Sequence, residues 1–515
     1  MTNDSHASPA LRLRALLPWA LSLLGVVSIV IWITILGSTL VNDEYAALDY
    51  AYRSLHLGRL APTPHRLHKP LAVLTALLVL PAGPVGYELA TAAWAGVLIF
   101  FCYRALRRAW GEAAAVAATL LIASTPDFFL NTAQGITVVP LLAGAFICIH
   151  ARLEMEAGRK GLWRYALVSL AIGLLRPDAW LFGLPLALAF WPRRRQWGYA
   201  RFLLAAGLIG LAPAIWFGKD WFINGNLFHS LHVAITDKTV GLGKVNFTAG
   251  EALAFFPKQI VPRISWPTFL CGLAGAGVFL LRRRWAGLLH PLFLFPLLIS
   301  GFVWLLIMTG VYPIQRYFYF TTVFLLMFAA YLGVEAAKWV RALRFPWPWV
   351  GAAAIAALLG LHLVLAEKRF EANYQELRHE AQIQREMHRV ADTLQAQIPA
   401  DERPLILIPA RRDEQLDWLF RDREIPNTLS FREAYYYQFI YHYSFLNFTP
   451  RWIVYINQDF HWHWVADEFE WLHFQDHTEL QGVKIDLFFH TDLIRVFQTT
   501  YPADWKSPPP PPPPY

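Results

Sequence analysis

Long apolar runs recur through the first 366 residues of the chain. A helix that crosses a bilayer needs about 20 consecutive apolar residues. The first run, residues 16–40, follows Arg12 and Arg14 and is too long for the apolar segment of a cleaved signal peptide, so we expect a retained anchor. Further runs lie at about 86–103, 111–125, 133–151, 164–177, 179–191, 201–218, 266–281, 286–308, 317–334 and 348–366. The pattern predicts about eleven membrane-spanning helices.

A polar segment, residues 41–85, separates the first two of these runs. Within it, residues 70–81 are apolar but too short to cross a bilayer, and Pro70 and Pro81 bound them. We therefore expect an interfacial or re-entrant helix inside the first outer loop.

The pattern changes after residue 366. Residues 367–397 are polar and helix-prone and are expected to continue the last span as a helix. Predicted strands at 405–408, 452–456 and 485–489 then alternate with predicted helices at 412–420, 431–445 and 463–473. This alternation favours a small α/β domain over residues 367–515, which ends in a disordered proline-rich tail at 507–515.

Composition supports a membrane protein. Hydrophobic residues make up 56% of the chain and charged residues 16%, whereas soluble domains have about 25% charged residues. Residues 1–366 carry 30 Lys and Arg against 14 Asp and Glu, and residues 367–515 carry 15 against 23. The basic excess therefore belongs to the apolar part, which argues against a nucleic-acid partner and for contacts with membrane lipids.

The positive charges also indicate an orientation. Basic clusters occur at 104–108, 152–164, 193–201, 282–284 and 338–344. With eleven spans and a cytoplasmic N-terminus, every cluster falls in a cytoplasmic loop, as the positive-inside rule requires. The sequence predicts an α-helical polytopic protein of the bacterial inner membrane, with residues 1–366 in the membrane and residues 367–515 as an extracytoplasmic, periplasmic domain.

Residues that could take part in catalysis or in phosphate binding lie at the outer ends of the predicted spans. The first outer loop begins with Asp43 and Glu44 and ends with His65, His68 and Lys69. It therefore combines carboxylates that could remove a proton with cations that could bind a phosphate. On position alone, the two carboxylates could equally be solvated residues that flank a span.

Two arginines interrupt apolar sequence at the depth of the outer leaflet. Arg176 precedes Pro177 and Asp178, and Arg316 precedes Tyr317. A buried arginine needs an anionic partner, because an isolated charge is costly in a membrane. A lipid phosphate is one candidate, and a structural ion pair with Asp178 or Asp127 is the other.

The order and sidedness of these motifs resemble the GT-C glycosyltransferase superfamily, in particular the branch of the protein O-mannosyltransferases and the aminoarabinose transferases of lipid A. The motifs are Asp43-Glu44, Lys69-Pro70, Leu175-Arg176-Pro177 and Arg316-Tyr317. Family members often carry an acidic residue before a proline in the fourth span. Residues 135–140 lack one here, although Asp127 lies shortly before them and could substitute.

The resemblance implies a transferase that moves a sugar from a polyprenyl-phosphate donor to a lipid, protein or glycan acceptor on the outer face, with inversion. It implies Asp43 as the base, with Glu44 orienting the acceptor or assisting the base. The donor phosphate would be bound by cations and polar groups at headgroup depth: Lys69, Arg316, Tyr317, Arg176 and His68.

Two other interpretations and a cofactor question stay open at this point. The chain could be an O-antigen ligase or polymerase, although the cations in its loop at 219–265 are dispersed. It could also be a transporter or flippase of lipid-linked sugars, although no internal repeat is visible. No cofactor is certain; a divalent metal has only His65 and His68, beside the carboxylates of the same loop, as weak candidate ligands.

Overall fold

The computed structural model describes residues 9–40, 42–56, 69–229, 247–309, 316–342, 350–399, 401–409, 412–422, 428–430, 444–457 and 471–507. The chain divides into two compact units. The helical unit comprises residues 1–37 and 61–377, and the sheet unit comprises residues 38–60 and 378–515.

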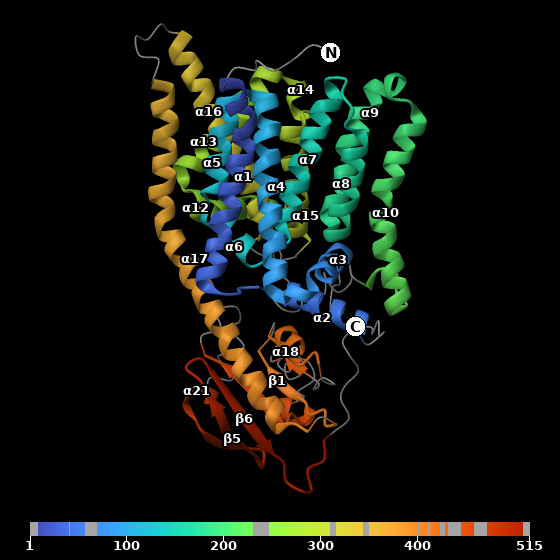
Figure 1. Cartoon of the computed structure of the whole chain (residues 1–515), viewed down its shortest axis with the longest axis vertical. Helices are drawn as coiled ribbons and strands as arrows, with labels where there is room; N and C mark the ends of the chain where they lie inside the picture. Colours follow the sequence, from blue (N-terminus) through green and yellow to red (C-terminus); the bar gives the residue numbers. More distant parts are fainter. Residues whose placement is uncertain are drawn as a thin grey trace. The chain divides into compact units, whose positions relative to one another are not determined.

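The helical unit is a bundle of long apolar helices. Its elements are α1 (Pro9–Leu36), α3 (Pro70–Val79), η1 (Leu80–Ala82), α4 (Gly83–Trp110), α5 (Glu112–Ala123), α6 (Pro126–Ala133), α7 (Val138–Glu156), α8 (Leu162–Leu175), η2 (Pro177–Phe182), α9 (Gly183–Trp197), α10 (Tyr199–Asn224), α12 (Ala249–Ile264), α13 (Trp266–Arg283), α14 (Trp285–Leu288), α15 (Pro291–Met308), α16 (Arg316–Ala342) and the first part of α17 (Val350–Gln397). α1, α4, α7, α8 and α10 form a row in this order (Figure 1).

Each of the predicted apolar runs lies on a helix. Among the described residues, six helices are long and apolar enough to cross a membrane, and two bent helix pairs raise the number to eight. The remaining predicted runs lie on α8 and α9, which are 14 and 15 residues long, and on α17. The short apolar stretch after Lys69 forms α3, as expected from its bounding prolines. The chain is thus a multi-pass membrane protein.

α7 lies in the centre of the helical unit and is buried along its whole apolar length, because its sequence is hydrophobic on every face. α16 is also mostly buried, whereas α1 exposes most of its surface. Small residues let α13 approach α16: a Cβ atom added to Gly275 would lie 2.0 Å from the carbonyl oxygen of Phe328.

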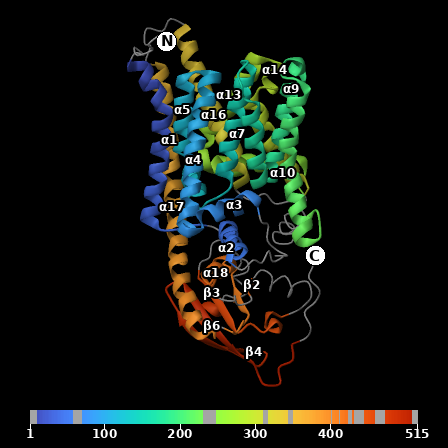
Figure 2. The ribbon, with the colours of Figure 1, turned by 45° about the vertical axis from the view of Figure 1, so that its right-hand side comes forward.

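The basic clusters of the sequence gather at one end of the helical unit. They lie at the C-terminal ends of α4, α7, α13 and α16 and around the turn from α9 to α10. α9 and α14 lie at the end of the unit where α1 begins (Figures 1 and 2). The positive charges therefore lie at one end of the helical unit, as the sequence predicts.

The sheet unit combines an early segment with the C-terminal part of the chain. Its elements are α2 (Asn42–His56), the end of α17, β1 (Ile406–Ile408), α18 (Asp413–Leu419), β2 (Thr428–Ser430), η3 (Phe445–Phe448), β3 (Trp452–Ile456), α21 (Trp471–Phe474), β4 (His477–Leu480), β5 (Val483–His490) and β6 (Ile494–Thr500). The strand order is β2-β1-β3-β6-β5-β4, with β1 parallel to β2 and β3 and the other pairs antiparallel.

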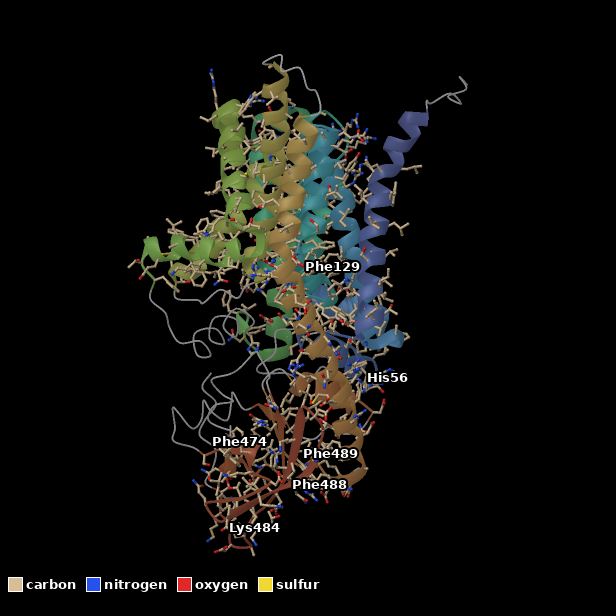
Figure 3. The ribbon with its side chains drawn as sticks, turned by 90° about the vertical axis from the view of Figure 1, so that its left-hand side faces the viewer. His56, Phe129, Phe474, Lys484, Phe488 and Phe489 are labelled. Atoms are coloured by element: carbon tan, nitrogen blue, oxygen red, sulfur yellow. The ribbon has the colours of Figure 1, made fainter. Side chains whose placement is uncertain are left out.

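Both faces of the central strands β1 and β3 are buried. Met387, Val390 and Leu394 of α17 cover one face, and Phe445, Leu446 and Leu472 cover the other. At a bulge between Leu487 and Phe489 in β5, Phe488 lies against Trp452, with ring centroids 5.0 Å apart (Figure 3). The expected α/β domain is present, and most of the predicted helices at 431–445 and 463–473 lies outside the described residues.

Candidate functional site

The N-terminal end of α16 lies between two buried ion pairs of the helical unit. Tyr317 and Tyr319 both belong to the first turn of this helix, and their side chains point to different sides because they are two residues apart. Tyr317 lies near Arg176, and Tyr319 lies near Asp127.

The first ion pair fixes Arg176 in an extended segment between α8 and η2. Its Nε and Nη2 atoms donate to the Asp178 carboxylate, at 3.0 Å from Oδ1 and 2.9 Å from Oδ2, and both side chains are buried. The Cζ atom of Arg176 lies 5.3 Å from the centre of the Tyr317 ring. Of the two partners expected for Arg176, the structure shows the carboxylate of Asp178. It also brings Arg176 next to Tyr317, which was predicted to bind the phosphate of the sugar donor.

The second ion pair joins Asp127 to Arg263, and only Asp127 was named as a candidate from the sequence. Asp127 lies in the first turn of α6, where the helix dipole favours a carboxylate. The Nη1 atom of Arg263 lies 3.2 Å from its Oδ2 atom, and the Nε atom of Arg369 lies 3.8 Å from its Oδ1 atom. Asp127 and Arg263 are buried, as is Tyr319.

Aromatic side chains of α1 and α17 pack against α6, the helix that carries Asp127. Phe129 of α6 packs between Trp32 and Phe370, with ring centroids 5.6 and 5.7 Å apart (Figure 3). These ring contacts help to hold α6 in place, and Asp127 on this helix is buried away from water. In such an environment, the attraction between Asp127 and its arginines is stronger than in water.

Arg263 and Arg369 are the two residues of this region that sequence reasoning missed. Arg263 was grouped with the dispersed cations of the loop at 219–265. A local signal was available for its helix: Thr248 and Glu251 form a capping box at the start of α12, and Arg263 lies in the last turn. Nothing local connects Arg263 to Asp127.

A small cavity of about 20 Å³ lies between α3, α4, α7 and the end of α8. Such a space holds about one water molecule. Leu71, which closely follows Lys69, and Leu175, which precedes Arg176, both line it. Thr137 and Pro140 also line it. Residues 135–140, which contain no acidic residue, therefore contribute a threonine to the cavity wall.

The predicted base and its neighbour belong to the sheet unit. Asp43 and Glu44 both lie in the first turn of α2. Glu44 is 1% exposed, so it is not a solvated flanking residue. The side chains of Asp43 and of Arg316, which begins α16, lie outside the described residues, as do His65 and His68 altogether.

α2 is anchored at both ends within the sheet unit. At its start, the Tyr45 hydroxyl donates to Oε1 of Gln384 at 3.0 Å, and Nε2 of Gln384 donates to the Leu40 carbonyl at 2.7 Å. At its end, the Tyr52 hydroxyl donates to Asp422, which raises the pKa of that tyrosine because ionisation would place two negative charges together. These contacts hold the backbone that carries Asp43.

The described residues contain no group of three or more His, Cys, Asp or Glu side chains that could hold a metal ion. The two carboxylates of the buried ion pairs, Asp127 and Asp178, are each paired with arginine.

No family model matches the chain, and no curated protein is similar enough in sequence to match. Its structure resembles ArnT from Cupriavidus metallidurans. With ArnT bound to undecaprenyl phosphate it shares 14% identity over 94% of this chain and 97% of ArnT, with a TM-score of 0.55. With apo ArnT it shares 14% identity over 94% and 98%, with a TM-score of 0.57. A match to the oligosaccharyltransferase AglB from Archaeoglobus fulgidus has 12% identity over 86% of this chain and 70% of AglB, and a TM-score of 0.49. The chain therefore shares its fold with ArnT, and this likeness bears out the resemblance noted in its sequence.

Proposed function

We propose that this protein is a membrane glycosyltransferase that moves a sugar from a polyprenyl-phosphate donor to a lipid, protein or glycan acceptor. The observation that carries the proposal is the likeness to ArnT over 94% of the chain, in a structure of ArnT bound to undecaprenyl phosphate. The polar groups of the chain support it, because Arg176 and Tyr317 meet at the start of α16. The ArnT fold favours this function over a ligase or a transporter.

The reaction we propose is one displacement at the anomeric carbon. Asp43 takes the proton of the acceptor hydroxyl, and the hydroxyl oxygen forms the new glycosidic bond. The bond between the anomeric carbon and the donor phosphate oxygen breaks, and the polyprenyl phosphate leaves with the electron pair. A single displacement inverts the configuration, as in single-displacement glycosidases. Glu44, next to Asp43, would orient the acceptor.

The donor phosphate would be bound by Lys69 and Arg316, with Tyr317 and His68 beside them. Lys69 precedes the first residue of α3, and Arg316 begins α16. Because Asp178 already holds two nitrogen atoms of Arg176, we assign Arg176 to the positioning of Tyr317. A divalent metal would need His65 and His68 as ligands in addition to the carboxylates.

We place the protein in the bacterial inner membrane with the basic end of the helical unit in the cytoplasm. The clusters of Lys and Arg at that end support this orientation through the positive-inside rule. The N-terminus would then be cytoplasmic and the sheet unit periplasmic, which puts the chemistry on the outer face.

The function is tested with the purified protein in lipid nanodiscs and a radiolabelled undecaprenyl-phosphate sugar. We expect release of undecaprenyl phosphate together with transfer of the label to an acceptor from the cell envelope. In sealed proteoliposomes, uptake of the intact donor without cleavage would instead identify a transporter and contradict the proposal.

Replacement of Lys69 by glutamine is expected to raise KM for the donor at least about tenfold and to change kcat less. A charge-assisted hydrogen bond to a phosphate contributes about 1.5–3 kcal/mol, and its loss weakens binding in the ground state and the transition state alike. Steady-state kinetics against donor concentration measures this. Lys258→Gln, at an exposed lysine of α12, is the matched control. An unchanged KM in Lys69→Gln would remove Lys69 from the donor site.

Cysteine labelling tests the orientation. Lys160 and Asp401 are both exposed, the first in the turn between α7 and α8 and the second after α17. We expect a membrane-impermeant maleimide to label Asp401→Cys once the outer membrane is permeabilised, and Lys160→Cys only after the inner membrane is opened. The unaltered protein gives the background from Cys271, since Cys102 and Cys148 are buried. The reverse labelling pattern would contradict the assigned orientation.

A further inference from the structure

A second cavity lies at the basic end of the helical unit, between α1, α4 and α7. Its volume is about 470 Å³, within the range of small-molecule binding sites. One wall is apolar and consists of residues of α1 and α4, namely Ala15, Pro18, Trp19 and Phe100. The other wall is polar and consists of residues of α4 and α7, namely Arg104, Arg107, Arg108 and His150. None of these residues takes part in the glycosyl transfer proposed above.

The polar wall carries an excess of positive charge. Arg107 is paired with Glu112, whose Oε2 atom lies 3.5 Å from its Nε atom. Arg108 donates through Nε to the Leu153 carbonyl at 3.2 Å, and Arg104 is exposed with its Cζ atom 5.6 Å from the Phe100 ring centre. Among the described residues, neither Arg104 nor Arg108 has a carboxylate within ion-pair distance. Guanidinium groups bind phosphate oxygens through paired hydrogen bonds, so this wall suits a phosphate.

His150 gives a second, independent indication of a ligand. Its side chain lines the cavity and the residue is only 3% exposed. Within the described part of the chain, its Nδ1 atom has no hydrogen-bond partner. The nearest carboxylate, that of Glu154, lies 3.8 Å away and accepts a hydrogen bond from Arg164 at 2.9 Å. A buried ring nitrogen without a partner is costly, and an oxygen-rich ligand in the cavity would satisfy it.

The apolar wall continues onto the exposed face of α1. Trp19 packs on Phe100 with ring centroids 4.4 Å apart and is 63% exposed. One turn further along α1, the Ser22 hydroxyl donates to the Gly96 carbonyl at 2.7 Å and so links α1 to α4. The outward face of α1 then presents large apolar side chains, namely Leu23, Leu24, Val27, Ile31 and Ile35. An acyl chain could therefore lie along α1 while its headgroup fills the cavity.

We propose that this cavity binds the phosphodiester headgroup of an anionic phospholipid. The arginines bind the phosphate, His150 donates or accepts one further hydrogen bond, and Trp19 lies at the level of the headgroups, where tryptophan is favoured. Basic pockets between spans suit anionic lipids, since each Arg or Lys contributes about 1 kcal/mol of attraction near a charged surface. The apolar continuation along α1 favours a lipid over a soluble phosphate compound.

Native mass spectrometry of the delipidated full-length protein tests this inference. We expect phosphatidylglycerol to bind at least about tenfold more tightly than phosphatidylcholine, and Arg104→Glu to weaken its binding about tenfold, because the change replaces attraction by repulsion. Arg104 is exposed and, among the described residues, makes no hydrogen bond or ion pair with another element, so the variant should fold; a matching elution profile and melting temperature check this. Arg159→Glu, an equal charge change at an exposed residue after α7, is the control and should bind like the unaltered protein.

Three outcomes would overturn the inference. Equal losses in Arg104→Glu and Arg159→Glu would show a general charge effect. Equal affinity for both lipids would show that the net negative charge of the headgroup does not select, since both lipids carry a phosphodiester. Competition by inorganic phosphate or glycerol phosphate at the affinity of the lipid would assign the cavity to a soluble anion. Glycosyl transfer is not needed for any readout, so failure here leaves the proposed function intact.

Discussion

Asp43→Asn is expected to lower kcat at least about a hundredfold while the protein still inserts and folds. General-base catalysis contributes roughly 10²–10⁴-fold, and an amide cannot accept the proton of the acceptor hydroxyl. The change keeps the size of the side chain, and α2 stays anchored through Tyr45 and Tyr52, so the backbone should not move. The measurement is single-turnover transfer from the polyprenyl-phosphate sugar, which separates the chemical step from product release.

Asp401→Asn is the matched control for this change, since Asp401 is an exposed aspartate of the same unit. It should transfer at the rate of the unaltered protein. Glu44→Gln should raise KM for the acceptor more than it lowers kcat, because Glu44 orients the acceptor in the proposal. Turnover within about threefold of normal in Asp43→Asn would remove Asp43 from the mechanism.

Asp127→Ala is expected to destabilise the helical unit by about 3–5 kcal/mol, because it leaves buried Arg263 without its counter-charge. The apparent melting temperature in detergent should fall by at least about 5 °C. Activity should fall as well, because Tyr319 packs at this ion pair and Tyr317 lies in the same helical turn. Intrinsic tryptophan fluorescence during heating measures the first effect.

The double variant Asp127→Leu with Arg263→Met separates charge from packing. It removes both charges at once, so it should recover a large part of the lost stability. Arg369 is partly exposed and can be solvated when its partner is gone. If Asp127→Ala melts at the temperature of the unaltered protein, the Asp127–Arg263 pair does not stabilise the unit.

The apolar pattern predicted the helices well because a bilayer leaves few alternatives to helices. In the sheet unit it found the central strands β1 and β3, which are buried on both faces and read as continuous apolar runs. It also found β5 but missed β2, β4 and β6: His477–Leu480 alternates between exposed and half-buried residues, and Ile494–Thr500 ends in polar residues.

In the candidate site, too, the contacts between residues close in sequence were predictable, and those between distant residues were not. Arg176 and Asp178 are two residues apart, so their ion pair could be named in advance as one of two alternatives. The pair of Asp127 with Arg263 joins helices that are far apart in the sequence, and only tertiary packing brings them together. The placement of α2 in the sheet unit was equally beyond local reasoning, because its partner Gln384 follows 339 residues after Tyr45.

That separation has a consequence for biosynthesis. Ribosomes add about 5–20 residues per second, so α2 is made roughly 20–70 s before Gln384 exists to receive it. The helix that carries the proposed base therefore waits without its final support until the segment of α17 that carries Gln384 has been made. A nascent polypeptide that lacks residues 378–515 would therefore lie in the bilayer with α2 unsupported, and synthesis of these residues completes the unit that holds this helix.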